Sequence, residues 1–151
     1  MLRVSKLTDY GTVVMTHMAR QPRHIHTASG IADAVYLPTS TVSKLMKIMT
    51  REGLLVSHRG AKGGYSLARQ PEAISVAQVI HALEGPIAFT ECSYATGKCS
   101  QEQSCSIRGN WQHINRAVRQ ALEGVSLADM TRPVTLQPIA MGSAVARMPA
   151  E

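Results

Sequence analysis

All three cysteines of this 151-residue chain lie in one short segment, as Cys92, Cys99 and Cys105. Six residues separate the first pair and five separate the second. The surrounding segment, residues 91–105, is polar and turn-prone and has no apolar periodicity, so packing in a core does not explain the clustering. Thiolates are soft ligands that bind metals readily. We therefore expect this segment to hold something that binds sulfur.

A disulfide framework is the first alternative, and an odd number of cysteines argues against it. The first ten residues lack the basic and then apolar layout of a signal peptide. No apolar run approaches the roughly 20 residues that cross a bilayer. We therefore expect a soluble protein of the reducing cytoplasm without a membrane partner.

Two uses of the thiols that need no iron are a structural zinc site and a metal-free redox switch. Zinc accepts three thiolates and one nitrogen or oxygen ligand, but its sites usually contain a closely spaced pair of cysteines, which this chain lacks. A redox switch needs only two cysteines and predicts a colourless protein. These two alternatives differ in metal content.

Catalysis is not indicated by any motif. The chain has no nucleophile elbow, metalloprotease helix motif, Rossmann fingerprint or P-loop. Its six histidines are scattered without ligand spacing, apart from His24 and His26. We therefore expect a protein that is not an enzyme and has no small-molecule substrate.

Charge divides the chain into two unequal halves. Residues 1–69 contain ten lysines and arginines against three acidic residues, a balance of +7. Residues 70–151 contain six against seven, a balance of −1. A localised basic excess favours a polyanion partner, most simply nucleic acid.

Apolar spacing in the basic half predicts three helices. The first covers about residues 5–20, and Thr27 is placed to cap a short second helix. Pro38 suits the first turn of a third helix that Gly53 stops. The buried stripe of the third helix is expected to be Val42, Leu45, Met46 and Met49. Two helices joined by a short turn fit a helix-turn-helix.

A hairpin is expected directly after the third helix. Residues 54–58 read as a strand, 59–64 as a glycine-rich cationic turn and 65–67 as the return strand. A P-loop would need a helix after the glycines, whereas a strand follows here. Helix, helix and hairpin in this order predict a winged helix-turn-helix.

The face of the third helix opposite its apolar stripe, together with the hairpin tip, is the expected DNA-binding surface. Lys44 can reach guanine acceptors in the major groove, and Arg59 can enter an adjacent minor groove. Arg51 lies on the same helix face. The candidate DNA-binding residues are Ser40, Thr41, Ser43, Lys44, Lys47, Arg59 and Lys62.

Two further helices flank the cysteine segment. Ser75 and Gln78 form a capping-box pattern for a helix that ends at Gly85. A long helix starts near residue 106, and its apolar residues recur every 3.5 positions on average, which suits packing on a partner helix. Packing on the protein's own core is the alternative. We expect a homodimer with contacts at Ile107, Trp111, Ile114 and Val118.

The expected fold is mainly α, a winged helix-turn-helix with a cysteine loop and a long C-terminal dimerisation helix. We expect three regions: a DNA-binding region at 1–69, a cluster-binding loop and dimerisation helices at 70–130, and a disordered tail at 131–151. The tail is rich in proline and small residues. A short helical turn is expected after Ser126.

Several of these motifs together resemble the Rrf-two family of transcription regulators, whose iron-sulfur members include IscR, NsrR and SUF-operon regulators. The resemblance covers about residues 1–130. It rests on Leu-Thr-Asp-Tyr at 7–10, the wing at 57–67, Ser-Val-Ala-Gln-Val-Ile at 75–80 and the triple-cysteine loop before a Trp-containing helix. Residues 54–67, 83–88 and 122–130 most resemble the proteobacterial regulators of the SUF iron-sulfur assembly system.

The resemblance implies a homodimeric repressor or dual regulator of promoter DNA that senses iron-sulfur status, redox signals or nitric oxide. Cys92, Cys99 and Cys105 would then hold an iron-sulfur cluster, with 2Fe-2S favoured over 4Fe-4S. Arg108 stands where IscR-type proteins have a histidine ligand, and arginine cannot take that role. Asp9 matches an aspartate that NsrR-type members contribute from the partner subunit, while His113 is a weaker candidate for the fourth ligand.

Overall fold

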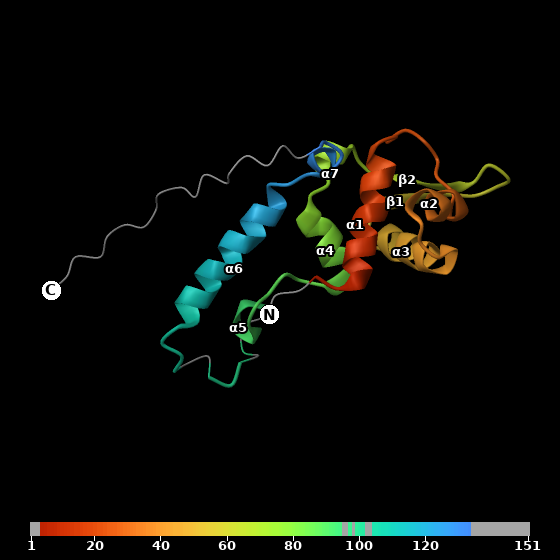
Figure 1. Cartoon of the computed structure of the whole chain (residues 1–151). Coiled ribbons are helices and arrows are strands. Elements are labelled where there is room, and N and C mark those ends of the chain that lie inside the picture. The colour runs from red at the N-terminus through yellow and green to blue at the C-terminus, as the bar shows by residue number, and fades with distance from the viewer. Residues whose placement is uncertain (1–3, 95–96, 98, 102–103, 134–151) are drawn as a thin grey trace.

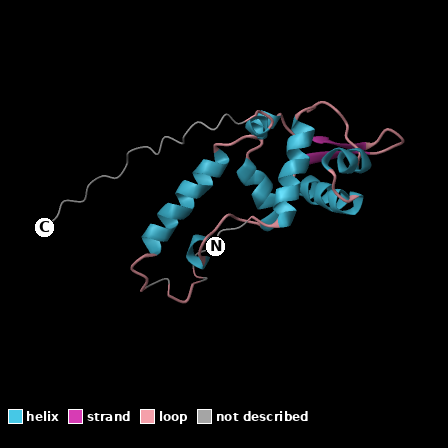
Figure 2. Cartoon of the chain, viewed as in Figure 1, coloured by secondary structure: helices cyan, strands magenta, loops and turns pink. Residues whose placement is uncertain are grey.

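The computed structural model of the chain describes residues 4–94, 97, 99–101 and 104–133. This part is mainly helical with one small sheet, as expected from the sequence (Figure 2). The elements follow one another as α1 (Lys6–Ala19), α2 (Ala28–Val35), α3 (Thr39–Arg51), β1 (Leu55–His58), β2 (Gly64–Leu67), η1 (Pro71–Ala73), α4 (Val76–Glu84), α5 (Glu91–Tyr94), α6 (Arg108–Glu123) and α7 (Leu127–Met130). In Figure 1, α4 lies between α1 and α6.

The first two helices begin where the sequence predicts. The Ser5 side chain accepts from the Thr8 N–H, and the Thr27 side chain accepts from the Gly30 N–H. These bonds satisfy N–H groups that have no partner inside the helix. Pro38 precedes α3 as its N-cap instead of lying in its first turn.

The core lies between α1, α3 and α4. The stripe predicted on α3 is fully buried, and Val14, Met15 and Met18 face it from α1. Leu127 from α7 joins the same cluster. This packing fixes α3, so its opposite face is directed outward.

The hairpin pairs in antiparallel register, from Leu55 opposite Leu67 to His58 opposite Gly64. His58 Nε2 and Ser66 Oγ lie 2.8 Å apart across the two strands. A second connection holds the hairpin to the α1–α2 loop. The His26 N–H donates to the Tyr65 carbonyl and the Tyr65 N–H donates to the His26 carbonyl, both at 2.8 Å. The wing is therefore docked on the body of the molecule.

The capping box at the start of α4 is present as predicted. The long helix α6 begins at Arg108, two residues after the predicted start, because residues 106 and 107 form a turn. The short helix α5 was not predicted. It begins at a polar turn in which the Ser93 N–H donates to the Thr90 carbonyl at 2.9 Å.

The helical turn after Ser126 is α7, and it has a capping box of its own. Of the predicted tail at 131–151, residues 134–151 lie outside the described residues. Within the described part of the chain, no helix has both the length and the apolar character to cross a membrane.

Candidate DNA-binding surface and cysteine loop

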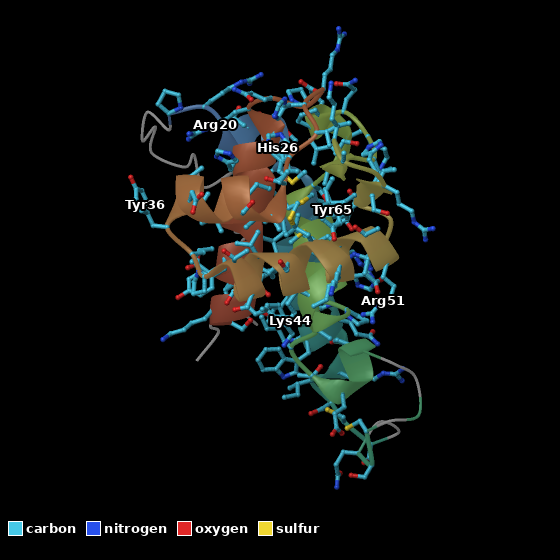
Figure 3. The ribbon with its side chains drawn as sticks, turned by 90° about the vertical axis from the view of Figure 1, so that its right-hand side faces the viewer. Arg20, His26, Tyr36, Lys44, Arg51 and Tyr65 are labelled. Carbon is cyan, nitrogen blue, oxygen red and sulfur yellow. The ribbon has the colours of Figure 1, made fainter. Side chains whose placement is uncertain are left out.

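The outward face of α3 carries the predicted hydroxyl and lysine side chains. Ser40, Lys44 and Lys47 are exposed, whereas Thr41 and Ser43 are half-buried at the edge of the buried stripe. Figure 3 views the molecule with α3 in front and shows Lys44 near the middle of this helix. An exposed face with hydroxyls and cations suits contacts with phosphates and base edges.

The wing presents the two predicted cations at its tip. Arg59 and Lys62 are both exposed in the turn between β1 and β2. The Gly63 N–H donates to the Gly60 carbonyl at 2.9 Å and closes this turn. Gly60 has φ +106°, a conformation that glycine adopts without strain. The glycines therefore shape the turn that carries the cations.

Arg51 at the end of α3 differs from the lysines because it already has an acidic neighbour. Its Nε lies 3.2 Å from Glu52 Oε1 in an exposed ion pair. Exposed pairs of this kind contribute about 0–1 kcal/mol. Arg51 therefore stays available for other contacts at small cost.

The cysteine loop connects α4 to α6. Cys99 and Cys105 are half-buried and are not in a disulfide. Cys92 lies in α5, and its side chain is outside the described residues. The Cys105 carbonyl accepts from the Arg108 N–H at 3.4 Å, which places the last cysteine at the start of α6.

Asp9 is exposed in the first turn of α1. Among the described residues, no three histidine, cysteine or acidic side chains form a group that could hold a metal ion. Asp9 therefore does not join Cys99 and Cys105 in a metal-binding group within one protomer. His113, the other candidate fourth ligand, is exposed on α6.

Glu84 ties the start of α1 to the end of α4, a contact that the sequence analysis missed. The Ser5 N–H donates to Glu84 Oε1 at 3.0 Å. Hydrogen bonds from the side chains of Thr8 and then Ser5 lower the pKa of Glu84. Because Glu84 is the last residue of α4, the beginning of the cysteine loop is anchored beside the first turn of α1, which carries Asp9.

The apolar stripe predicted on α6 faces away from the protein's own core. Ile107, Trp111 and Ile114 are 53%, 37% and 44% exposed, and Val118 is half-buried. No described residue of α6 is fully buried. Packing on the protein's own core therefore does not account for this stripe.

Three histidines that looked scattered in the sequence lie together. The ring centroids of His24 and His26 are 4.8 Å apart, and those of His17 and His26 are 5.8 Å apart. Burial lowers the pKa of His26, and the hydrogen bond to the Gln21 carbonyl partly opposes this shift. Repulsion from His24 and His17 lowers the pKa of His26 further. His17 lies in the last turn of α1 and the other two follow in the loop after it, so the chain reversal brings the three rings together.

The helix pair α2–α3, the docked hairpin and the exposed basic face define a winged helix-turn-helix of the kind found in DNA-binding regulators. A family model, Rrf2, described as an iron-dependent transcriptional regulator, matches residues 4–133. The chain therefore belongs to the Rrf2 (Rrf-two) family of transcriptional regulators.

Individual relatives agree with this assignment. Protein rrf2 of Nitratidesulfovibrio vulgaris is 30% identical over 141 residues, which is 91% of this chain and 92% of that protein. The solved structure of CymR, the global cysteine regulator of Bacillus subtilis, is 30% identical with a TM-score of 0.69 and covers 87% of this chain and 97% of that one. The structure of T. potens IscR is 29% identical with a TM-score of 0.63 and covers 85% of both chains.

These similarities confirm two predictions. The chain has the fold of winged-helix regulators, and its relatives are transcriptional regulators, so it is not an enzyme. A role in regulating transcription by binding DNA is thereby established at the level of the family.

Proposed function

We propose that the chain is a homodimeric, promoter-binding regulator that senses iron-sulfur status through a cluster on its cysteine loop and controls iron-sulfur assembly genes of the SUF type. The observation that carries this proposal is the grouping of all three thiols between α4 and α6, next to a winged helix-turn-helix. The assignment of SUF-type target genes is supported by a resemblance to SUF regulators in residues 54–67, 83–88 and 122–130.

The DNA contacts are assigned to the exposed face of α3 and to the wing. Lys44 is exposed on α3 and reads base edges, whereas Lys47 on the next turn neutralises phosphates. Arg59 and Lys62 at the wing tip enter the adjacent groove. The hydroxyls of Ser40, Thr41 and Ser43 fix the helix start on the backbone or on base edges.

The dimer forms through α6. Its exposed stripe of Ile107, Trp111 and Ile114, with Val118 beside it, is apolar and has no partner in the described part of the protomer. A second copy of the helix can cover it along a heptad seam. A twofold dimer would then place two α3 helices in successive turns of the major groove.

The cluster ligands are the thiolates of Cys92, Cys99 and Cys105. The described thiols, Cys99 and Cys105, are unbonded and therefore free to bind iron. The donor set suits the group because thiolates are the usual ligands of iron-sulfur clusters. A bound cluster supplies a redox-sensitive and iron-dependent link between the loop and the dimer helix.

The fourth ligand is assigned to Asp9 of the partner subunit. Asp9 is exposed, and among the described residues it belongs to no group of three side chains that could hold a metal ion, so it is available to a second copy. Arg108 at the start of α6 cannot bind iron, because a guanidinium has no free lone pair at neutral pH. An oxygen ligand on α1 would couple the cluster directly to the DNA-binding half.

The test is anaerobic purification of the full chain followed by its visible spectrum and its iron and sulfide content. We expect a coloured protein that loses its cluster when any of the three cysteines is changed to alanine. Asp9→Ala should make the cluster more labile. Asp33 is another exposed carboxylate on a helix, and Asp33→Ala should leave the stability of the cluster unchanged. A colourless protein with stoichiometric zinc would refute the cluster.

The similarity to CymR favours one alternative, a thiol-based regulator without a cluster. The two described thiols of this chain, Cys99 and Cys105, are not in a disulfide, so an oxidant could join them if the loop rearranged. A colourless, metal-free protein whose promoter binding depends on oxidant would support this alternative. Gel shifts with and without the cluster assign the DNA-binding form under the main proposal.

A further inference from the structure

The turn between α2 and α3 carries a large side chain that nothing in the described part of the protomer covers. Tyr36 is 94% exposed, more than any other large apolar or aromatic side chain that the structure describes. Its hydroxyl forms no hydrogen bond with a described residue. Figure 3 shows Tyr36 projecting from this turn, away from the rest of the molecule. Packing within the protomer therefore does not explain a tyrosine at this position.

The backbone conformation at Tyr36 does not favour tyrosine either. Its φ of 56° and ψ of 41° lie in the left-handed region, and no other described residue except glycine has a positive φ. The N–H groups of Tyr36 and Leu37 both donate to the Ala32 carbonyl and so close the end of α2. Glycine is the usual residue at such a helix end because it has no Cβ to clash. Side chains kept in strained conformations cluster at functional sites.

The residues on both sides of Tyr36 hold this turn in place. Val35 and Leu37 pack against the hydrophobic core. Pro38 follows as the N-cap of α3. The tyrosine ring is therefore displayed on a fixed turn, two residues before the N-cap of the helix assigned to the major groove. A contact made from a fixed turn loses little conformational freedom on binding.

The place of Tyr36 beside the start of α3 points to the sugar-phosphate backbone of DNA. In helix-turn-helix proteins, the N-terminal residues of the recognition helix contact base edges, and the preceding helix crosses the backbone. The turn between these helices therefore lies at the edge of the groove. In Figure 3, α3 runs from the side of Tyr36 past Lys44 to Arg51. Tyrosine is one of the side chains that donate hydrogen bonds to phosphate oxygens.

We propose that Tyr36 contacts the DNA backbone: its hydroxyl donates to a phosphate oxygen at the edge of the groove that α3 enters, and its ring packs on the adjoining deoxyribose. The inference rests on the proposed placement of α3 in the major groove and does not depend on the cluster. The contact positions the recognition helix and carries no sequence information of its own. A neutral phenol releases no counterion, so the contact adds nothing to the salt dependence of binding.

Fluorescence anisotropy of the full chain with its own promoter and with an unrelated duplex tests the contact. Tyr36→Phe removes only the hydroxyl and should weaken binding to both duplexes by at least about threefold. Tyr36→Gly also removes the ring and should weaken both by at least about tenfold. Its melting temperature should stay at or above that of the wild type, because glycine adopts a positive φ without strain. Both variants should keep the salt dependence of the wild type.

Promoter DNA with a single methylphosphonate linkage locates the contact. At the linkage beside Tyr36, loss of the charged oxygen should weaken the wild type more than Tyr36→Phe, because the variant has no hydroxyl to lose its partner. Met130→Ala is the control for removal of an exposed side chain, since Met130 is 40% exposed on α7, which lies apart from α2 and α3 (Figure 1). This variant should bind both duplexes as the wild type does.

Three results would overturn the proposal: unchanged DNA affinity of Tyr36→Gly, a loss confined to the promoter, or equal sensitivity of the wild type and Tyr36→Phe to every methylphosphonate. Lys44→Ala separates this contact from the placement of α3. If Lys44→Ala weakens promoter binding and Tyr36→Gly does not, only the contact by Tyr36 is refuted. If neither variant weakens binding, the placement of α3 in the groove is refuted as well.

Discussion

Replacing Gly64 with alanine should separate the wing from the body of the protein. A Cβ atom at this position would lie 2.5 Å from the His26 carbonyl oxygen and 2.9 Å from Ile25 Cγ2. The first neighbour is backbone and cannot turn away. The clash can be relieved only if the wing and the α1–α2 loop move apart, which breaks the two hydrogen bonds between His26 and Tyr65.

The size of the effect follows from these contacts. Two lost backbone hydrogen bonds cost about 0.5–1.5 kcal/mol each. Residual overpacking adds about 1 kcal/mol or more. The reduced entropy of the unfolded alanine chain returns about 0.4–1 kcal/mol. We therefore expect Gly64→Ala to lower the free energy of unfolding by about 2–3 kcal/mol.

Urea denaturation followed by circular dichroism measures this change, and a gel shift measures the loss of DNA affinity when the wing is released. Gly109→Ala is the matched control, because no described atom outside its own helix backbone and its two chain neighbours lies within 4 Å of its added Cβ. In the first turn of α6 it should be neutral or stabilising by up to about 1 kcal/mol. A Gly64→Ala protein within about 0.5 kcal/mol of wild type would refute the docking argument.

Three further predictions concern titration and DNA. Because burial lowers the pKa of His26, the folded state binds fewer protons at this side chain than the unfolded chain does. The contribution of neutral His26 to stability is complete above about pH 6.5 and is lost as the pH falls through the lower pKa of the folded state. His26→Gln should reduce this loss of stability in thermal melts. The lowered pKa of Glu84 likewise makes the folded state less stable as the pH falls, but at more acidic pH. Glu84→Gln should therefore weaken the dependence of the melting temperature on pH below about pH 5. An unchanged pH dependence in this variant would contradict this reasoning. Lys44→Ala should weaken promoter binding by about 1–3 kcal/mol and relax the sequence preference of binding. Lys47→Ala should instead weaken binding to all sequences and reduce the dependence of binding on salt. Equal effects of the two variants on sequence preference would argue against base reading by Lys44.

Local signals explain the accuracy of the sequence analysis in the N-terminal half. The stripe on α3, the cap at Thr27 and the capping box at Ser75 are all present. Each depends on residues within one or two helical turns, so spacing and residue type are sufficient to predict it. The hairpin follows equally directly, because the glycine-rich turn joins two short alternating strands.

The parts that were missed depend on contacts between distant residues. Ser5 meets Glu84 across 79 positions, and His26 pairs with Tyr65 in the wing. Such pairs leave no periodic pattern in the chain. The histidine cluster was hidden for the same reason, since a chain reversal brings His17 to His26. The boundaries at residues 69 and 130 and the roles of the candidate site residues stay predictions.

The sequence by itself determined the helix-turn-helix, the cationic wing and the grouping of three thiols in one polar segment, because composition and short-range spacing specify them. The tertiary structure decided how those parts face one another. It turned the polar side of α6 towards α4, where Asn115 lines a pocket, and left Trp111 exposed for a partner. Periodicity shows that a helix has two faces, but which face is covered depends on the elements packed against it.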